Sequence, residues 1–400
     1  MPIKPNSLSF TVLLGILAAL PPLSIDMALP AFPTIATSLD TSPAAVGLTL
    51  SLFMVGYATS QLAFGPFSDR YGRKPALLIG CGLFALAGAG CAMAPSINAL
   101  LAWRFFQGAG AGAGMTLMLA IVRDLFENAA ARAQLSYVNL VMTVAPMIAP
   151  TIGGGLLAIA GWRVIYGLLA VGGLVLLLTV ALGLSESIKS RDLNAIKPRR
   201  FIKNYVSVLS NRICLSYALV NALSFGCMFA YVAGSPLVML KVLGLSTTTY
   251  GLLFALTAFG IMAGSFLNGQ LNTRGISSAG LLSFGLVLAA TSAVALVIVS
   301  GSGVAQVMTL MPLLILNTFG YGLIAPNAIH HALEPVPEIT GVAAALVGFL
   351  RMLAGAIASA LIGFLFDGHT AFAMSAVMAL FAIASLAIYA RLRFLNSIKL

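Results

Sequence analysis

The chain has 400 residues, of which 60% are hydrophobic and only 8% are charged. Because a soluble domain carries about 25% charged residues, this composition excludes ordinary globular, disordered, fibrous and coiled-coil proteins. The net charge of +11 would indicate nucleic acid only if the basic residues formed one compact patch, and they are scattered among the loops. The sequence therefore predicts an all-α polytopic membrane protein that does not bind nucleic acid.

Twelve apolar runs are long enough to cross a bilayer as helices. They are predicted at residues 9–30, 44–66, 76–94, 98–121, 134–158, 164–184, 211–234, 250–270, 278–300, 306–329, 340–363 and 371–391. The first run is long, carries an acid and is followed by further runs, so we expect a retained span and not a cleaved signal peptide.

Basic residues outside the spans fall almost entirely in alternate loops. With a cytoplasmic N-terminus, only Arg163 and Lys241 lie on the outer side. The positive-inside rule then predicts that both termini are cytoplasmic.

A long polar segment divides the twelve spans into two sets of six. We therefore predict an N-terminal six-helix bundle at residues 1–186, a basic cytoplasmic linker at 187–210 and a C-terminal six-helix bundle at 211–400. A weak repeat, which aligns Asp69 with Asn272 and Gly72 with Gly275, suggests that the halves are related. Transporters built from such repeats bind substrate between their halves near mid-membrane.

Three charged residues fall in the interior of the predicted spans, away from the residues at their cytoplasmic ends, namely Asp26, Arg104 and Arg351. An ionisable group inside a bilayer is costly and is by default a functional candidate. Asp26 is predicted to bind and release a proton, the alternatives being a structural ion pair or a helix-end acid among headgroups. Arg104 lies at a similar depth, so it would lower the pKa of the acid or orient a polar substrate. Arg351 would face a cavity or bond carbonyls of a neighbouring helix.

Polar and aromatic residues in the spans are candidates for substrate contact. Span seven carries Asn221, Phe225, Phe229 and Tyr231, which would stack on an amphipathic ligand or pack between helices. Asn139 and Asn317 would hydrogen-bond a ligand or another helix.

Small residues and prolines mark sites of close packing. In span five, Pro146, Pro150, Gly153 and Gly154 permit a bend and close helix contact. In span four, alternate glycines from 108 to 114 are interpreted as a small-residue stripe, since no phosphate-loop context surrounds them.

Enzyme chemistry has little support in this sequence. No catalytic serine–histidine–acid set or redox motif is evident, and the pair His330 and His331 has no carboxylate or cysteine at metal-ligand spacing. We expect no metal, no cofactor and no enzymatic activity.

The loop between spans two and three reads Gly-Pro-Phe-Ser-Asp-Arg-Tyr-Gly-Arg-Lys from residue 65 to 74 and resembles the signature loop of the major facilitator superfamily. The resemblance extends over essentially the whole chain. It implies a cytoplasmic conformational latch in which Asp69 lies near the start of span eleven and Arg73 or Arg70 pairs with Asp124. The implied latch residues are Gly65, Asp69, Arg70, Gly72, Arg73 and Asp124.

Other motifs resemble a drug-exporting branch of this family. Arg104 with Gln107 and Gly108 resembles a span-four motif linked to proton coupling, and the segment from Ala149 to Gly154 resembles the span-five antiporter motif. That segment departs from the motif in having Ala145 and Ala149 where glycine is usual. The first-span segment from Pro22 to Pro30 resembles the Bcr/CflA group of drug:proton antiporters, as does the segment from Ser224 to Phe229.

The resemblance implies export of amphipathic compounds, such as bicyclomycin-like antibiotics or phenicols, in exchange for protons. Asp26 would be the proton site, Arg104 its coupling partner and Gln107 part of the binding region. The implied protein is a monomer in the bacterial cytoplasmic membrane whose partners are small substrates, protons and lipid. Alternatives are a dedicated exporter of one amino acid or siderophore, a uniporter or proton symporter, and a channel or receptor.

Overall fold

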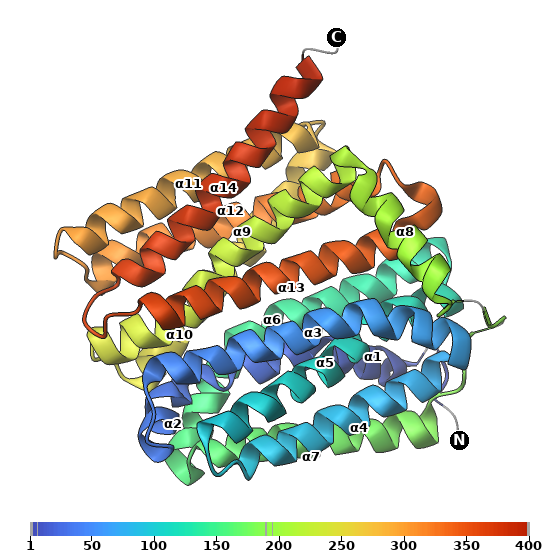
Figure 1. Ribbon diagram of the computed structural model, residues 1–400, viewed down its shortest axis with the longest axis horizontal. Coiled ribbons are helices and arrows are strands. Elements are labelled where there is room, and N and C mark those ends of the chain that lie inside the picture. Colours follow the sequence, from blue (N-terminus) through green and yellow to red (C-terminus); the bar gives the residue numbers. More distant parts are fainter. Residues whose placement is uncertain (1–2, 6, 189, 194, 398–400) are drawn as a thin grey trace. The chain divides into compact units, whose positions relative to one another are not determined.

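The computed structural model describes residues 3–5, 7–188, 190–193 and 195–397, and it is helical throughout the regular parts of these ranges (Figure 1). Twelve helical segments are long and apolar enough to cross a membrane, which confirms the twelve predicted spans. The chain separates into two compact units. The first contains Met1–Thr41 and Leu52–Lys203, and the second contains Ser42–Ser51 and Asn204–Leu400.

The first unit contains the first six spans. Its first span is interrupted: α1 (Leu8–Asp26) is followed by the short helices η1 (Leu29–Ala31) and α2 (Phe32–Ser38). The others are α3 (Pro43–Tyr71), α4 (Arg73–Ala92), α5 (Ile97–Leu125), α6 (Asn128–Ala160) and α7 (Trp162–Gly183), and the first residues of α3 group with the second unit. Within this unit, α4 packs against both α5 and α7, as Figure 1 shows.

Proline determines where the first span is interrupted. The helix α1 continues through Pro21 and Pro22 and ends at Asp26, four residues before Pro30 in η1. A proline lacks the backbone N–H that would continue the helix ladder. The break places an ionisable side chain at an interrupted helix end, where backbone carbonyls lack intrahelical donors.

Glycines let α5 approach its neighbours at backbone distance. A Cβ at Gly108 would collide with the carbonyl of Phe53 on α3, and one at Gly110 would come within 2.7 Å of the carbonyl of Gly80 on α4. Gly114 lies against the carbonyl of Leu17 on α1. Alternate residues lie about 200° apart around a helix, so these glycines do not form the single stripe predicted from sequence. They serve several different helix contacts.

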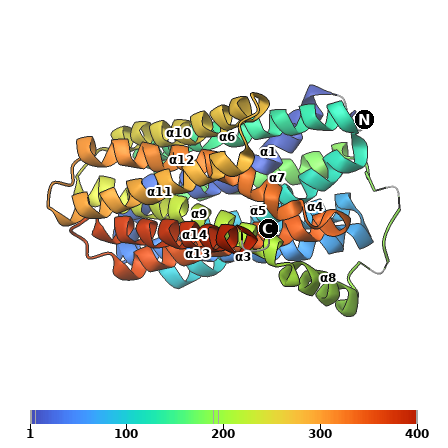
Figure 2. The ribbon, with the colours of Figure 1, turned by 90° about the horizontal axis from the view of Figure 1, so that it is seen from above.

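The second unit contains the last six spans. Its helices are α9 (Arg212–Pro236), η2 (Leu237–Val242), α10 (Thr247–Thr273), α11 (Ser278–Gly301), α12 (Val307–Leu333), η3 (Pro337–Ile339), α13 (Thr340–Leu365) and α14 (Phe372–Ser397). Figure 2 shows α11, α12 and α14 within this set. One core cluster joins Val220 of α9 to Leu282 and Leu286 of α11, Ile324 of α12 and Tyr389 of α14.

The linker contains a helix that the hydrophobic pattern did not predict. Residues Pro198–Ser210 form α8, which leads into α9 (Figures 1 and 2). Its Val208 is fully buried in a cluster with Cys214, Val336, Ala343 and Leu346. Apolar residues recur at helical spacing in this segment, as Ile202, Tyr205 and Leu209 show. The segment is nevertheless too short and too basic to register as an apolar run of about 20 residues.

Candidate functional site

Asp26 is buried at the end of α1 without a bonding partner. Its exposed fraction is 5%, and no hydrogen bond or ion pair joins its carboxylate to any residue that the structure describes. A carboxylate that leaves water without a hydrogen bond or counter-charge strongly favours its neutral form. Among the described residues, Asp26 is therefore a buried and unpartnered acid at this helix end.

Arg104 lies fully buried on α5 and reaches the same end of α1. Its Nη1 donates to the carbonyl oxygen of Ser24 at 3.1 Å and to Oε1 of Gln107 at 2.7 Å. The guanidinium carbon lies 4.4 Å from the ring centroid of Phe53 and 5.6 Å from that of Tyr166. Hydrogen bonds to a helix carbonyl and contacts with aromatic faces both stabilise a cation in an apolar interior.

The structure brings Arg104 into the region of Asp26 but not into an ion pair with it. Among the described residues, the guanidinium nitrogens Nε and Nη2 of Arg104 have no hydrogen-bond acceptor. The amide N–H of Ala28 bonds Ile25, which leaves the carbonyl of Ser24 open to an outside donor. The guanidinium therefore caps the helix end, and two of its nitrogens remain available to a ligand or to a repositioned carboxylate. The guanidinium therefore does not pair directly with the Asp26 carboxylate. The helix break leaves the carbonyl of Ser24 without an intrahelical donor, and Arg104 bonds this carbonyl instead.

The predicted antiporter segment packs on this same helix end. A Cβ at Gly153 of α6 would collide with the carbonyl of Met27, the residue after Asp26. Pro146 and Pro150 lie inside a continuous α6, and Gly154 is buried. Glycine at 153 thus permits direct backbone contact beside the acid. A hinge role for this segment stays a prediction.

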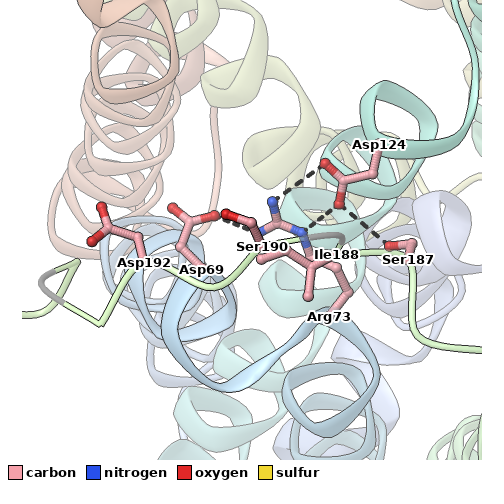
Figure 3. A pocket seen from close by; sticks show the side chains of 7 residues that line it. All are labelled: Asp69, Arg73, Asp124, Ser187, Ile188, Ser190 and Asp192. Atoms are coloured by element: carbon pink, nitrogen blue, oxygen red, sulfur yellow. Dashed lines mark hydrogen bonds and ion pairs between the residues drawn. The ribbon is translucent and has the colours of Figure 1, made fainter.

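The signature loop contains a buried arginine between two acids (Figure 3). Arg73, which is 4% exposed, places Nη1 at 2.6 Å from Oδ1 of Asp69 and Nε at 2.8 Å from Oδ2 of Asp124. Arg70 instead lies over the ring of Tyr71 at 5.3 Å. The structure thus selects Arg73 from the two predicted partners of Asp124. The approach of Asp69 to span eleven, and the latch role itself, stay predictions.

A cavity of about 400 Å³ adjoins this cluster. Its lining consists of Asp69, Arg73, Asp124, Ser187, Ile188, Ser190 and Asp192, as Figure 3 shows. The start of the linker forms one of its walls. Ser187 Oγ donates to Asp124 at 3.3 Å, and the N–H of Asp192 donates to the carbonyl of Asp69 at 3.0 Å.

Glu186 is a functional candidate that sequence reasoning missed. Its Oε1 accepts from the N–H of Arg73 at 2.9 Å, and its Oε2 accepts from the N–H of Lys74 at 3.3 Å. It therefore caps the start of α4, where Gly72 has a φ of +108° and supplies no capping side chain. The available signal was a helix start without a Ser, Thr, Asp or Asn cap, because its orphan N–H groups need an acceptor from elsewhere.

We expect Glu186→Ala to loosen the signature loop. Loss of an N-terminal cap costs about 1 kcal/mol, with a further contribution from the helix dipole. The thermal midpoint of the purified protein should fall by a few degrees, and amide exchange at residues 73–76 should accelerate. Glu127→Ala, which removes an acid that makes no side-chain cap bond to α6, is the control. Equal exchange at residues 73–76 in both variants would refute the capping role.

In the second unit, an aromatic group surrounds Arg351. Phe225 stacks on Phe229 with ring centroids 5.6 Å apart and contacts Tyr321 at 6.1 Å. The guanidinium carbon of Arg351 lies 5.4 Å from the centroid of Phe225. Asn221 is fully buried on α9, and neither its amide nitrogen nor its amide oxygen has a partner among the described residues. The sequence analysis did not predict a role for Tyr321, because no motif in the tenth span distinguishes this tyrosine from a packing residue.

Other predicted substrate residues take part in helix packing. Asn317 donates to the carbonyl of Ala289 at 3.0 Å and to Ser292 Oγ at 3.2 Å, while Cys227 donates to its oxygen. The hydroxyl of Tyr231 bonds Thr257 at 2.8 Å, and its ring stacks on Phe254 with centroids 5.9 Å apart. These groups are satisfied within the protein, so the structure favours the packing interpretation for them.

Two further predictions have separate outcomes. Asn139 is exposed on α6, so the structure does not place it among the buried candidates.

His330 and His331 do have a neighbouring carboxylate, contrary to the sequence argument, because the end of α12 brings Glu334 within reach of both. The ring of His331 is already bonded to Ser278 at 2.9 Å and to Glu334 at 3.3 Å.

Comparisons with known proteins agree with this architecture. The sequence pattern of the Major Facilitator Superfamily matches residues 14–359. An uncharacterized MFS-type transporter, YdgK of Bacillus subtilis, is 36% identical over 97% of this chain and 96% of its own length. The bicyclomycin resistance protein homolog of Haemophilus influenzae is 31% identical over 88% of each chain. Multidrug resistance protein D of Escherichia coli is 29% identical over 90% of this chain and 89% of its own.

Solved structures show the same fold. A bacterial homologue of the human lysosomal transporter Spinster, in an inward-facing and occupied conformation, has a TM-score of 0.75 and 16% identity, covering 98% of this chain and 97% of its own. The xylose transporter XylE of E. coli has a TM-score of 0.71 and 14% identity, covering 96% of this chain and 98% of its own.

Proposed function

The chain belongs to the major facilitator superfamily, and from this premise we propose that it exports amphipathic drugs in exchange for protons. Membership makes it a multi-pass membrane transporter of small substrates and not an enzyme. Drug export is supported by relatives named for bicyclomycin and multidrug resistance. Proton exchange is supported by the buried, unpartnered carboxylate of Asp26 beside the end of α1.

In the proposed cycle, Asp26 carries the proton, and Arg104 holds the end of α1 on which Asp26 lies. Opening to one side would hydrate the carboxylate and favour its charged form, whereas closure would favour its neutral form. Drug entering from the cytoplasm or inner leaflet would compete with the proton for this region. Because Asp26 is the one acid within a predicted span, the proposal assigns one proton to each cycle.

The two six-helix bundles would expose the site to each side in turn, as in other transporters built from repeats. The cluster of Arg73, Asp69 and Asp124 would act as a cytoplasmic latch that favours the outward-facing state. Protonation or substrate binding would shift the populations and release it.

Such an exchange is driven by the membrane potential as well as by the pH gradient. Each positive charge that moves inward supplies about 2.3 kcal/mol per 100 mV. A neutral drug exchanged for one proton uses both sources, whereas a monovalent cation would use the pH gradient alone. The proposal places a monomer in the bacterial inner membrane with both termini cytoplasmic.

Everted membrane vesicles with a dye-reported pH gradient test the proposal. We expect several chemically unrelated antibiotics, including a phenicol and bicyclomycin, to cause dequenching only when the protein is present. A response to one amino acid or siderophore alone would instead indicate a dedicated metabolite exporter. Transport of drug without any proton movement would reject the exchange mechanism.

A further inference from the structure

Among the described residues, Arg351 is a half-buried cation on a membrane-spanning helix and has no acidic partner. It lies on α13, about 17 Å along the helix from Thr340. The acids of the second unit are Glu334, Glu338 and Asp367, and each lies at a helix end or in a loop. No carboxylate lies within 4.0 Å of Arg351 in the part of the chain that the structure describes, and its Nε has no acceptor there.

The surroundings of Arg351 offer aromatic faces and one hydroxyl group but no counter-charge among the described residues. The ring of Phe225 lies 5.4 Å from the guanidinium carbon, and the hydroxyl of Tyr321 on α12 is within hydrogen-bonding reach of the guanidinium. A cation over a ring gains about 0.5–2 kcal/mol, which is less than the penalty for a charged group at mid-membrane depth. A bound anion would supply the missing counter-charge.

Asn221 provides an independent observation on the same side of α9. It is one turn from both Ala218, which packs against Ala332 and Val347, and Phe225, which contacts Tyr321 and Arg351. Asn221 therefore faces the junction of α9, α12 and α13. Both of its amide atoms are fully buried and unpartnered among the described residues. A buried amide without partners is costly unless a ligand hydrogen-bonds to it.

We propose that this junction is a subsite for aromatic compounds that carry a carboxylate, with Arg351 as the residue that selects for the negative charge. The guanidinium binds the carboxylate, because its planar donors match the two oxygens. Phe225 and Tyr321 contact the aromatic ring, and Asn221 hydrogen-bonds a second polar group of the ligand. This inference rests on the proposed export function and narrows its substrates, disfavouring cationic drugs at this subsite.

The test compares two fluorescent probes of nearly equal shape on the purified protein, 6-hydroxy-2-naphthoate and 6-hydroxy-2-naphthamide, each of which carries a hydroxyl as the second polar group for Asn221. We expect wild type to bind the carboxylate about tenfold more tightly than the amide, which corresponds to one charge-assisted hydrogen-bonded pair. Arg351→Gln should remove this preference, and Arg351→Lys should retain part of it. Asn221→Leu should weaken the binding of both probes, while the carboxylate still binds more tightly than the amide. Arg393→Gln, which removes another arginine beside a tyrosine ring in the same unit, should leave the preference intact.

Two outcomes would overturn the subsite, namely equal binding of both probes to wild type or an unchanged ratio in Arg351→Gln. Chloramphenicol-dependent proton movement in vesicles separates this failure from failure of the proposed function. If chloramphenicol is exported with protons and naphthoate has no advantage, the subsite is wrong and the export proposal stands. If naphthoate binds through Arg351 but no drug moves protons, the export proposal is wrong and the subsite stands.

Discussion

Asp26→Asn is expected to abolish drug-dependent proton movement while leaving a folded protein that still exchanges drug. Asparagine has nearly the shape of aspartate but cannot bind and release a proton in this pH range. The carboxylate has no ion-pair partner among the described residues, so its replacement breaks no salt bridge. We expect the thermal midpoint of the variant to stay within a few degrees of wild type, because one unpartnered buried polar group replaces another of nearly the same shape.

Two assays on proteoliposomes separate proton coupling from substrate binding. Drug-dependent proton flux should fall to background in Asp26→Asn, whereas counterflow of labelled chloramphenicol should persist. The counterflow rate should also lose its dependence on pH. Asp40→Asn is the matched control, since Asp40 is exposed and its φ of +47° suits asparagine. Proton flux that survives in Asp26→Asn would move the proton site to another residue.

Gly108→Ala is expected to cause a large loss of stability for a substitution that adds a single methyl group. The added Cβ would collide with the carbonyl of Phe53, and neither helix backbone can yield easily because Gly56 makes the reciprocal contact with Phe105. Forcing extra volume into a packed interior costs about 1–3 kcal/mol, and here the obstacle is backbone and not a flexible side chain. We expect a lower thermal midpoint, a reduced yield of monodisperse protein and loss of transport.

Gly167→Ala on α7 is the matched control. A Cβ at Gly167 meets nothing within 4 Å, so the same chemical change should be neutral or stabilise the helix by up to about 1 kcal/mol. Thermal unfolding in one detergent, followed by tryptophan fluorescence, compares the two variants. Equal midpoints for them would show that the α3–α5 contact is not tightly packed.

The composition and hydrophobic runs were sufficient to predict the helical membrane fold. In hydrocarbon every backbone polar group must be bonded internally, so an apolar run of about 20 residues has one stable form. The same argument isolated Asp26, Arg104 and Arg351, because a charge inside such a run is conspicuous. The motif from Gly65 to Lys74 indicated the family, and the match of the family pattern to residues 14–359 confirms it.

Hydropathy could not predict helices or caps that depend on tertiary contacts. The helix α8 is stabilised through Val208 against α9 and α13, and Glu186 caps a helix that starts more than a hundred residues earlier. Both depend on partners that are distant in sequence. Local patterns carry no information about such partners without the fold.

The sequence by itself determined which residues are chemically unusual, whereas the tertiary structure decided which of them have partners. Asn221 and Asn317 look alike in an apolar span, yet Asn317 bonds Ala289 and Ser292 while Asn221 bonds no described residue. Arg73 and Arg70 are equally basic, but the turn at Gly72 directs Arg73 between two acids. The physical reason is that burial and hydrogen bonding arise between helices, whereas hydropathy and charge are properties of each residue alone.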